Sequence, residues 1–286
     1  MATPEQLRHA GLHSVANEAC TGSALDLGAT VTGWKPRGGT EVLFLSRDAL
    51  VGEGDEIHGG VPICAPWFGH GRDDVDVPRP HGLVRWTPWR LAEERTSDEA
   101  TTLVWELTGE ETTHLPGAHH YPSDIWFRYV ARFAETLTLT LTIGSPSTTF
   151  VLDEALHTYF SVSGVHDAAI RGLEGARYRD YTAGATWRDS ESALRITGHT
   201  DRIYDGAGPL VIRDATRSLT LRTSGASNTV VWNPGPEGAD TLTGWAEDEW
   251  TSMICVEVGN VQHNAVTVPA GGSHTLTLEI SSGSLP

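Results

Sequence analysis

The 286-residue sequence has little cysteine, little basic charge and no long apolar run. Its three cysteines, Cys20, Cys64 and Cys255, are odd in number and lack CxxC spacing, which argues against a disulfide framework or a zinc site. No stretch of about 18 apolar residues is present, which excludes a transmembrane helix. The 20 basic residues are outnumbered by 37 acidic ones, so the formal net charge of −17 argues against nucleic acid or an anionic membrane as a partner.

Long amphipathic helical patterns are also nearly absent, and short strand-like segments take their place. Residues 136–142 read TLTLTLT, which puts leucine on one face of a strand and threonine on the other. Similar segments recur at close spacing among the 31 glycines and 15 prolines. Strands are expected at residues 24–31, 41–45, 101–107, 126–133, 136–143, 150–152, 194–197, 210–212, 219–223, 229–232, 252–258 and 274–280.

This pattern predicts an all-β chain, folded as one large antiparallel β-sandwich that spans residues 1–286 as a single domain. Residues 1–23 are expected to form an N-terminal extension, with a short helix between residues 3 and 19. A β-propeller is the structural alternative, but its blades require a repeated motif and none is visible. Residues 1–10 carry charges and lack the apolar centre of a signal peptide, so we expect a cytoplasmic monomer.

Two ionisable residues inside apolar, strand-like segments suggest an acid–base pair. His157 lies within residues 156–160 (LHTYF), and Glu257 interrupts the hydrophobic run at residues 253–261. Buried ionisable groups are costly unless they are paired or functional, so both are candidates for chemistry. The competing interpretation is that each is a hydrogen-bonded core residue.

Three loop-like stretches supply further candidates. In residues 58–69, glycine and proline set an irregular backbone beside Trp67, whose ring offers an apolar face to a sugar. His81 and Arg85 flank an expected loop-to-strand junction, where they suit hydroxyls or an anion. Asp201, in residues 198–204, suits two sugar hydroxyls. The competing interpretations are a structural aromatic residue, a surface ion pair and a capped turn.

A metal-dependent enzyme is a further alternative, raised by the clustered imidazoles of His114, His119 and His120. Their spacing matches no recognised ligand pattern. We therefore expect neither a metal site nor an organic cofactor.

Six short motifs, taken in order, resemble those of the hexose-6-phosphate 1-epimerases, a family of the aldose 1-epimerase (galactose mutarotase-like) group. They extend over about residues 25–280 and are found at residues 59–69, 81–85, 156–160, 200–204, 231–234 and 255–261. The resemblance implies a large β-sandwich and interconversion of the α and β anomers of an aldose. The implied partner is a small-molecule sugar or sugar phosphate.

The resemblance also implies a role for each matching residue. The histidine of the LHTYF motif is the general acid of the family, which here is His157, and the glutamate of the last motif is the general base, here Glu257. His81 and Asp201 match positions that bind sugar hydroxyls, and Arg85 matches a phosphate ligand. The nearby carboxylate is expected to raise the pKa of His157, and partial burial that of Glu257.

Two departures from the family pattern concern the substrate. His58, which we expect to contact the sugar, stands where the phosphosugar enzymes usually have arginine, and histidine is mostly neutral at pH 7. Phosphate binding would then depend on Arg85, with Arg72 or Arg79 nearby. Residues 235–239 (GPEGA) lack the lysine often found there. A neutral aldose is therefore an alternative substrate, and non-catalytic sugar binding is an alternative function.

Overall fold

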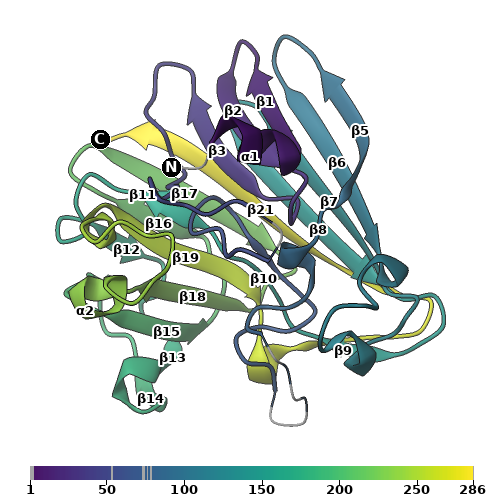
Figure 1. Ribbon diagram of the computed structural model, residues 1–286. Coiled ribbons are helices and arrows are strands. Elements are labelled where there is room, and N and C mark those ends of the chain that lie inside the picture. Colours follow the sequence, from purple (N-terminus) through teal and green to yellow (C-terminus); the bar gives the residue numbers. More distant parts are fainter. Residues whose placement is uncertain (1–2, 53, 73–74, 76, 78, 286) are drawn as a thin grey trace.

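Antiparallel strands are the main regular elements of the computed structural model, which describes residues 3–285 except 53, 73–74, 76 and 78 (Figure 1). The first of two eight-stranded sheets, sheet I, contains β14 (Thr186–Asp189), β13 (Arg177–Asp180), β15 (Thr200–Asp205), β18 (Asn228–Asn233), β19 (Met253–Asn260), β10 (Glu154–Leu156) and β4 (Ile63–Cys64) in that order, with β11 (Tyr159–Ser161) also pairing with β19. Sheet II contains, in order, β12 (Ala169–Arg171), β16 (Leu210–Arg213), β17 (Arg217–Ser224), β21 (Ser273–Ser284), β8 (Leu137–Gly144), β7 (Trp126–Phe133), β6 (Thr101–Thr108) and β5 (Arg90–Thr96). The predicted antiparallel β-sandwich is confirmed.

Smaller elements complete the described part of the chain. A three-stranded sheet contains β1 (Leu12–Ala16), β2 (Cys20–Leu25) and β3 (Val31–Pro36), and β9 (Phe150–Leu152) pairs with β20 (Val266–Val268). The helices are short: α1 (Pro4–His9), α2 (Gly235–Ala239) and the 3-10 helices η1 (Val84–Trp86), η2 (Gly109–Glu111), η3 (Ala118–His120), η4 (Tyr181–Ala183), η5 (Glu249–Ser252) and η6 (Gln262–Asn264). Among the described residues, no helix has the length and apolar character needed to cross a membrane.

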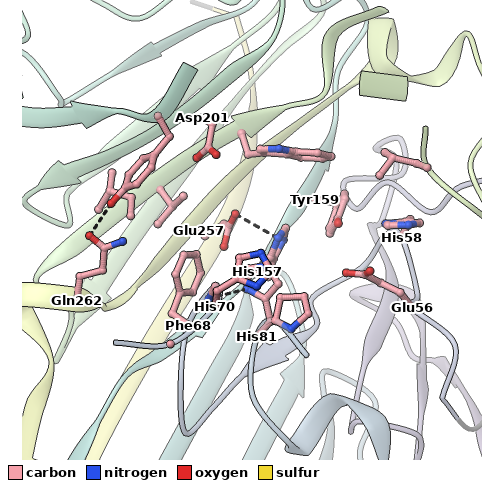
Figure 2. Close-up of a pocket in the computed structure, with 18 residues that line it drawn as sticks. Glu56, His58, Phe68, His70, His81, His157, Tyr159, Asp201, Glu257 and Gln262 are labelled. Carbon is pink, nitrogen blue, oxygen red and sulfur yellow. Dashed lines mark hydrogen bonds and ion pairs between the residues drawn. The ribbon is translucent and has the colours of Figure 1, made fainter. Parts of the chain in front are cut away.

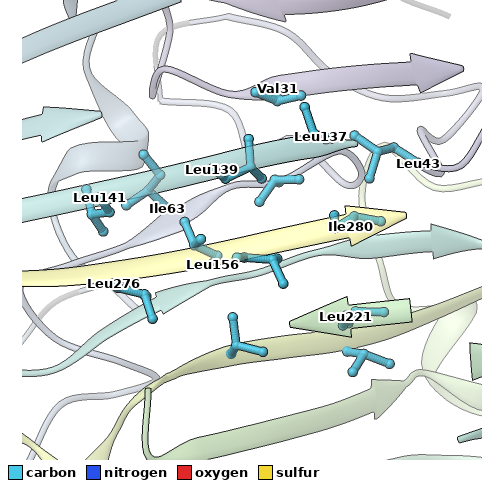
Figure 3. Close-up of a cluster of buried hydrophobic side chains, with 14 of the residues drawn as sticks. Val31, Leu43, Ile63, Leu137, Leu139, Leu141, Leu156, Leu221, Leu276 and Ile280 are labelled. Atoms are coloured by element: carbon cyan, nitrogen blue, oxygen red, sulfur yellow. The ribbon is translucent and has the colours of Figure 1, made fainter. Parts of the chain in front are cut away.

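The two sheets share one hydrophobic core (Figure 3). The alternating sequence of β8 buries Leu137, Leu139 and Leu141, whereas its threonines stay half-buried. Leu156 of sheet I is fully buried in the same cluster. Each buried leucine stabilises the fold by about 1.5–3 kcal/mol. A shared core is what a single domain requires, and the single-domain assignment stays a prediction.

Several predicted elements differ from the observed ones. Residues 24–31 do not form one strand, because the chain turns at Gly28 (φ 65°) between β2 and β3. Residues 41–45 and 194–197 make only isolated bridges. The predicted N-terminal helix is limited to α1, where a capping box between Thr3 and Gln6 begins it. Gly11 follows with a φ of 71°, which a helix does not allow, and the chain continues as β1.

Candidate active site

His157 and Glu257 face each other in sheet I. Glu257 is in the middle of β19, whereas His157 lies in the two-residue break between β10 and β11, so the expectation that both residues are on strands is wrong for His157. The ladder pairs on both sides of the break keep one register, which aligns His157 with Glu257. Opposite residues point to the same face of a sheet. The Nε2 atom of His157 is 3.3 Å from Oε1 of Glu257 (Figure 2).

The same register builds the floor of a cavity from two rows of side chains, because residues two apart on a strand share a face. Each row takes one side chain from each of four neighbouring segments of sheet I: β15, β18, β19 and the β10–β11 segment. The first row is Ile203, Val230, Glu257 and His157, and the second is Asp201, Trp232, Cys255 and Tyr159. All of these except Cys255 line a cavity of about 420 Å³. This volume is in the range of small-molecule binding sites.

Loop residues form the other walls, and two of them have an unusual backbone conformation. His81 and Gln262 both line the cavity and have φ values of 64° and 55°, which are uncommon for residues other than glycine. Such conformations persist where the surroundings enforce them, often at binding sites. Gly69 donates its N–H to Nδ1 of His81 at 3.3 Å, so the neutral ring carries its proton on Nε2. Burial lowers the pKa of His81 to about 3, which keeps the ring a neutral hydrogen-bond donor.

Burial also sets the protonation of the His157–Glu257 pair. It raises the pKa of Glu257 well above the usual value, and the charge of Asp201 adds to this effect. It lowers the pKa of His157, and His81 and Arg85 add to that. The expectation that the carboxylate raises the pKa of His157 is therefore wrong, because lost hydration outweighs the attraction within the pair. Among the described residues, Oε2 of Glu257 has no hydrogen-bond partner.

Asp201 is held by regular structure. It lies on β15, so the loop and capped-turn interpretations of residues 198–204 are wrong. Its ladder partner is Trp232 of β18, and both side chains line the cavity. Burial raises the pKa of Asp201.

Comparison with known proteins identifies the family. Residues 12–281 match the family model for aldose 1-epimerase. The chain belongs to the aldose 1-epimerase family. A Salmonella typhimurium protein named "Putative glucose-6-phosphate 1-epimerase" is 32% identical over 239 residues, which are 80% of this chain and 76% of that protein. A Cenchrus ciliaris protein with the same name is 27% identical over 276 residues, which are 91% of this chain and 80% of that protein.

A solved structure has the same fold. It is the crystal structure of a "putative mutarotase" from Salmonella typhimurium, which superimposes with a TM-score of 0.87 at 27% identity and covers 96% of this chain and 90% of that one. As a member of the aldose 1-epimerase family, the protein is an isomerase, and its substrate is a small-molecule sugar.

The aromatic residue that this epimerase presents to the cavity is not the predicted one. Trp67 is fully buried, stacks on Tyr121 at 5.7 Å and donates its indole N–H to the carbonyl of Arg79 at 2.9 Å, so its expected contact with a sugar is wrong. Trp232 lines the cavity instead. The strand expected at residues 229–232 was a usable signal, because Trp232 shares a face with Val230 and, through the ladder, with Glu257.

Arg85 lies behind the cavity wall of the epimerase. It is in the 3-10 helix η1, so the expected loop-to-strand junction is wrong, and its side chain is 3% exposed. Its Nη2 atom is 3.3 Å from Oε1 of Glu56, and its guanidinium lies over the Trp86 ring. Glu56 and His58 line the cavity, whereas Arg85 does not. Glu56 was missed because its acidic, glycine-rich segment is typical of an exposed loop.

The candidate metal ligands of the sequence are not assembled. His114, His119 and His120 are exposed. The described residues instead offer His157, Cys255 and Glu257, whose ligand atoms lie within 4.8 Å of one another. This group contains the candidate acid and base, and the expectation of a metal-free enzyme stays a prediction.

Proposed function

We propose that the protein interconverts the α and β anomers of an aldose by opening its ring, with His157 and Glu257 as the proton-transferring pair. The observation that carries this proposal is the 3.3 Å approach of the two side chains at the floor of the cavity. A non-catalytic sugar-binding protein has no need for such a pair. Family membership also favours the enzyme.

Ring opening requires one proton to leave the C1 hydroxyl and another to reach the ring oxygen. Glu257 takes the first proton and becomes a neutral acid, while His157 gives up the second and becomes a neutral imidazole. Burial favours both neutral forms, as the raised pKa of Glu257 and the lowered pKa of His157 indicate. The open-chain aldehyde then rotates about C1–C2. Ring closure on the other face returns both protons, so the pair ends as it began.

The remaining lining residues orient the sugar in this proposal. His81 donates its Nε2 proton to one hydroxyl, and Asp201 accepts from hydroxyls on the other side of the pair. Trp232 offers a ring to the C–H face of the sugar. The chemistry is the same for a neutral hexose and for the hexose 6-phosphate named in the relatives, because the phosphate takes no part in proton transfer.

The test is an anomerisation assay on glucose, galactose and glucose 6-phosphate, followed by polarimetry or a coupled anomer-specific enzyme, after subtraction of the spontaneous rate. His157→Gln is expected to lower kcat by about 100- to 10,000-fold, the usual contribution of a positioned acid or base. His166→Gln, at an exposed histidine outside the cavity, is the matched control and keeps full turnover. Full turnover by His157→Gln would remove the proposed acid.

A further inference from the structure

The cavity wall is acidic. Its described lining residues include three carboxylates, Glu56, Asp201 and Glu257, and no lysine or arginine. Figure 2 shows Glu56 and His58 on one side of the His157–Glu257 pair and Asp201 on the other. A phosphate ester carries between one and two negative charges at pH 7 and is normally bound by cations or by converging N–H groups. The lining supplies carboxylates at both ends of the cavity instead.

The buried cation behind this wall is already paired. The buried guanidinium of Arg85 has its Nη2 atom 3.3 Å from Oε1 of Glu56, and neither Nη1 nor Nη2 has a hydrogen-bond partner among the described residues. A buried charge without hydrogen bonds depends strongly on its counter-ion. Glu56, whose side chain is 38% exposed, is the ion-pair partner that the described residues provide. It therefore stands between Arg85 and the cavity.

The other basic side chains of this region do not replace Arg85. Burial lowers the pKa of His58, which leaves its ring neutral at pH 7. Arg72 donates to the carboxylate of Asp153 at 3.0 Å, and exposed Arg79 lies over the Trp86 ring. Neither arginine lines the cavity, and His58 is neutral, so none of the three places a positive charge at its wall.

We propose that Glu56 is a specificity-determining residue: it occupies Arg85 in place of a substrate phosphate, so the enzyme prefers a neutral aldose to the corresponding 6-phosphate. A phosphate ester would have to displace Glu56 from Arg85 and then bind beside the freed carboxylate. Juxtaposed like charges disfavour binding strongly. A neutral sugar leaves the Glu56–Arg85 pair intact. This inference rests on the proposed anomerase function and concerns only which sugars that function accepts.

The experiment compares kcat/KM for glucose and glucose 6-phosphate in the wild type, in Glu56→Gln and in Glu106→Gln. Glutamine keeps the shape of residue 56 and removes its charge. Glu106 is the matched control, since its side chain is 40% exposed and paired with Arg90 on sheet II, outside the cavity. Inhibition of glucose turnover by inorganic phosphate gives a second measurement that does not depend on the ester.

The expected wild-type preference is at least about tenfold for glucose, and Glu56→Gln moves the ratio toward the phosphate ester by about tenfold or more, the scale of one like charge at a half-exposed site. Phosphate also inhibits Glu56→Gln more strongly, whereas Glu106→Gln behaves like the wild type. High salt weakens the discrimination of the wild type but not that of Glu56→Gln. A wild-type preference for the ester, or a ratio that Glu56→Gln does not move, overturns the inference and leaves the proposed anomerase standing. If no sugar is turned over above the spontaneous rate, both fail together.

Discussion

Replacing Glu257 with glutamine separates what this residue does for catalysis from what it costs the fold. The side chain is 1% exposed, and burial raises its pKa because the charged form loses its hydration. Glutamine has the same shape but takes no proton from the C1 hydroxyl. We therefore expect kcat to fall by about 100- to 10,000-fold.

The same variant is expected to be more stable than the wild type at pH 7. The raised pKa means that the ionised form of Glu257 is less favourable in the folded protein than in water, so above the unfolded pKa of 4.5 this residue lowers the free energy of unfolding. Glutamine removes that contribution, so the free energy of unfolding should rise, on the order of 1 kcal/mol as for other relieved active sites. The gain disappears at pH 4, where the unfolded glutamate is itself largely protonated.

Glu154→Gln is the matched control, because Glu154 is a second fully buried glutamate of sheet I outside the cavity lining. Its Oε1 atom lies 3.1 Å from Nε2 of His274 and accepts from Asn260 at 3.2 Å, and this contact raises the pKa of His274. Loss of the charge should cost about 1–3 kcal/mol and leave kcat unchanged.

Anomerisation rates and urea unfolding of both variants, measured side by side at pH 7, separate the catalytic role of Glu257 from its effect on stability. The expected pattern is opposite in the two proteins: Glu257→Gln loses turnover and gains stability, whereas Glu154→Gln loses stability and keeps turnover. More than a tenth of wild-type turnover in Glu257→Gln would refute its role as the base. Loss of stability in both variants would refute the account of Glu257 as a costly buried group.

Three further predictions concern pH, sugar contact and backbone conformation. Between pH 6.5 and 5 the free energy of unfolding should fall by about 1.6 kcal/mol on account of His81, because the unfolded histidine (pKa 6.5) binds a proton that the folded one (pKa about 3) does not. Urea titrations at both pH values measure this change, and His81→Asn should reduce the pH dependence. Trp232→Ala should raise KM for the sugar about tenfold with little loss of stability, and steady-state kinetics measure this. Trp67→Ala should lower the free energy of unfolding by about 3–5 kcal/mol, which thermal melts measure. Gly82→Ala should lower the free energy of unfolding by more than about 2 kcal/mol, because the added Cβ would lie 1.9 Å from a backbone carbonyl oxygen. Gly38→Ala, whose Cβ meets nothing within 4 Å, should lower it by about 1 kcal/mol. An equal fall in Tm for both variants would contradict this prediction.

Regular strands were predictable where the sequence alternates. Residues 136–143 were assigned correctly because their leucines and threonines follow the two faces of a strand, and the observed β8 buries one set. Residues 41–45 were assigned wrongly because their apolar side chains report burial, not pairing. Val42 and Leu43 are buried, yet their backbone makes only isolated bridges. Apolar composition alone therefore identifies the core better than it identifies the ladder.

The candidate site was predictable to the extent that its residues look out of place. His157 and Glu257 stand out because each is ionisable within an apolar segment, and the structure brings them together. Trp67 was misplaced because residue type does not tell which way a loop turns its side chain. The positions of Arg85 and Glu56 depend on a contact between two loops, which no local pattern reports.

The two rows of side chains on sheet I also determine how far the protein must unfold before the active site loses its geometry. Amide protons of β15, β18 and β19 are held in ladders through the middle of the sheet, and such protons exchange with solvent only when a large part of the molecule opens. The loop walls, including residues 56–58 and 68–71, are held by single backbone bonds and isolated bridges instead of ladders. The floor of the site therefore keeps its geometry until a large part of the protein unfolds.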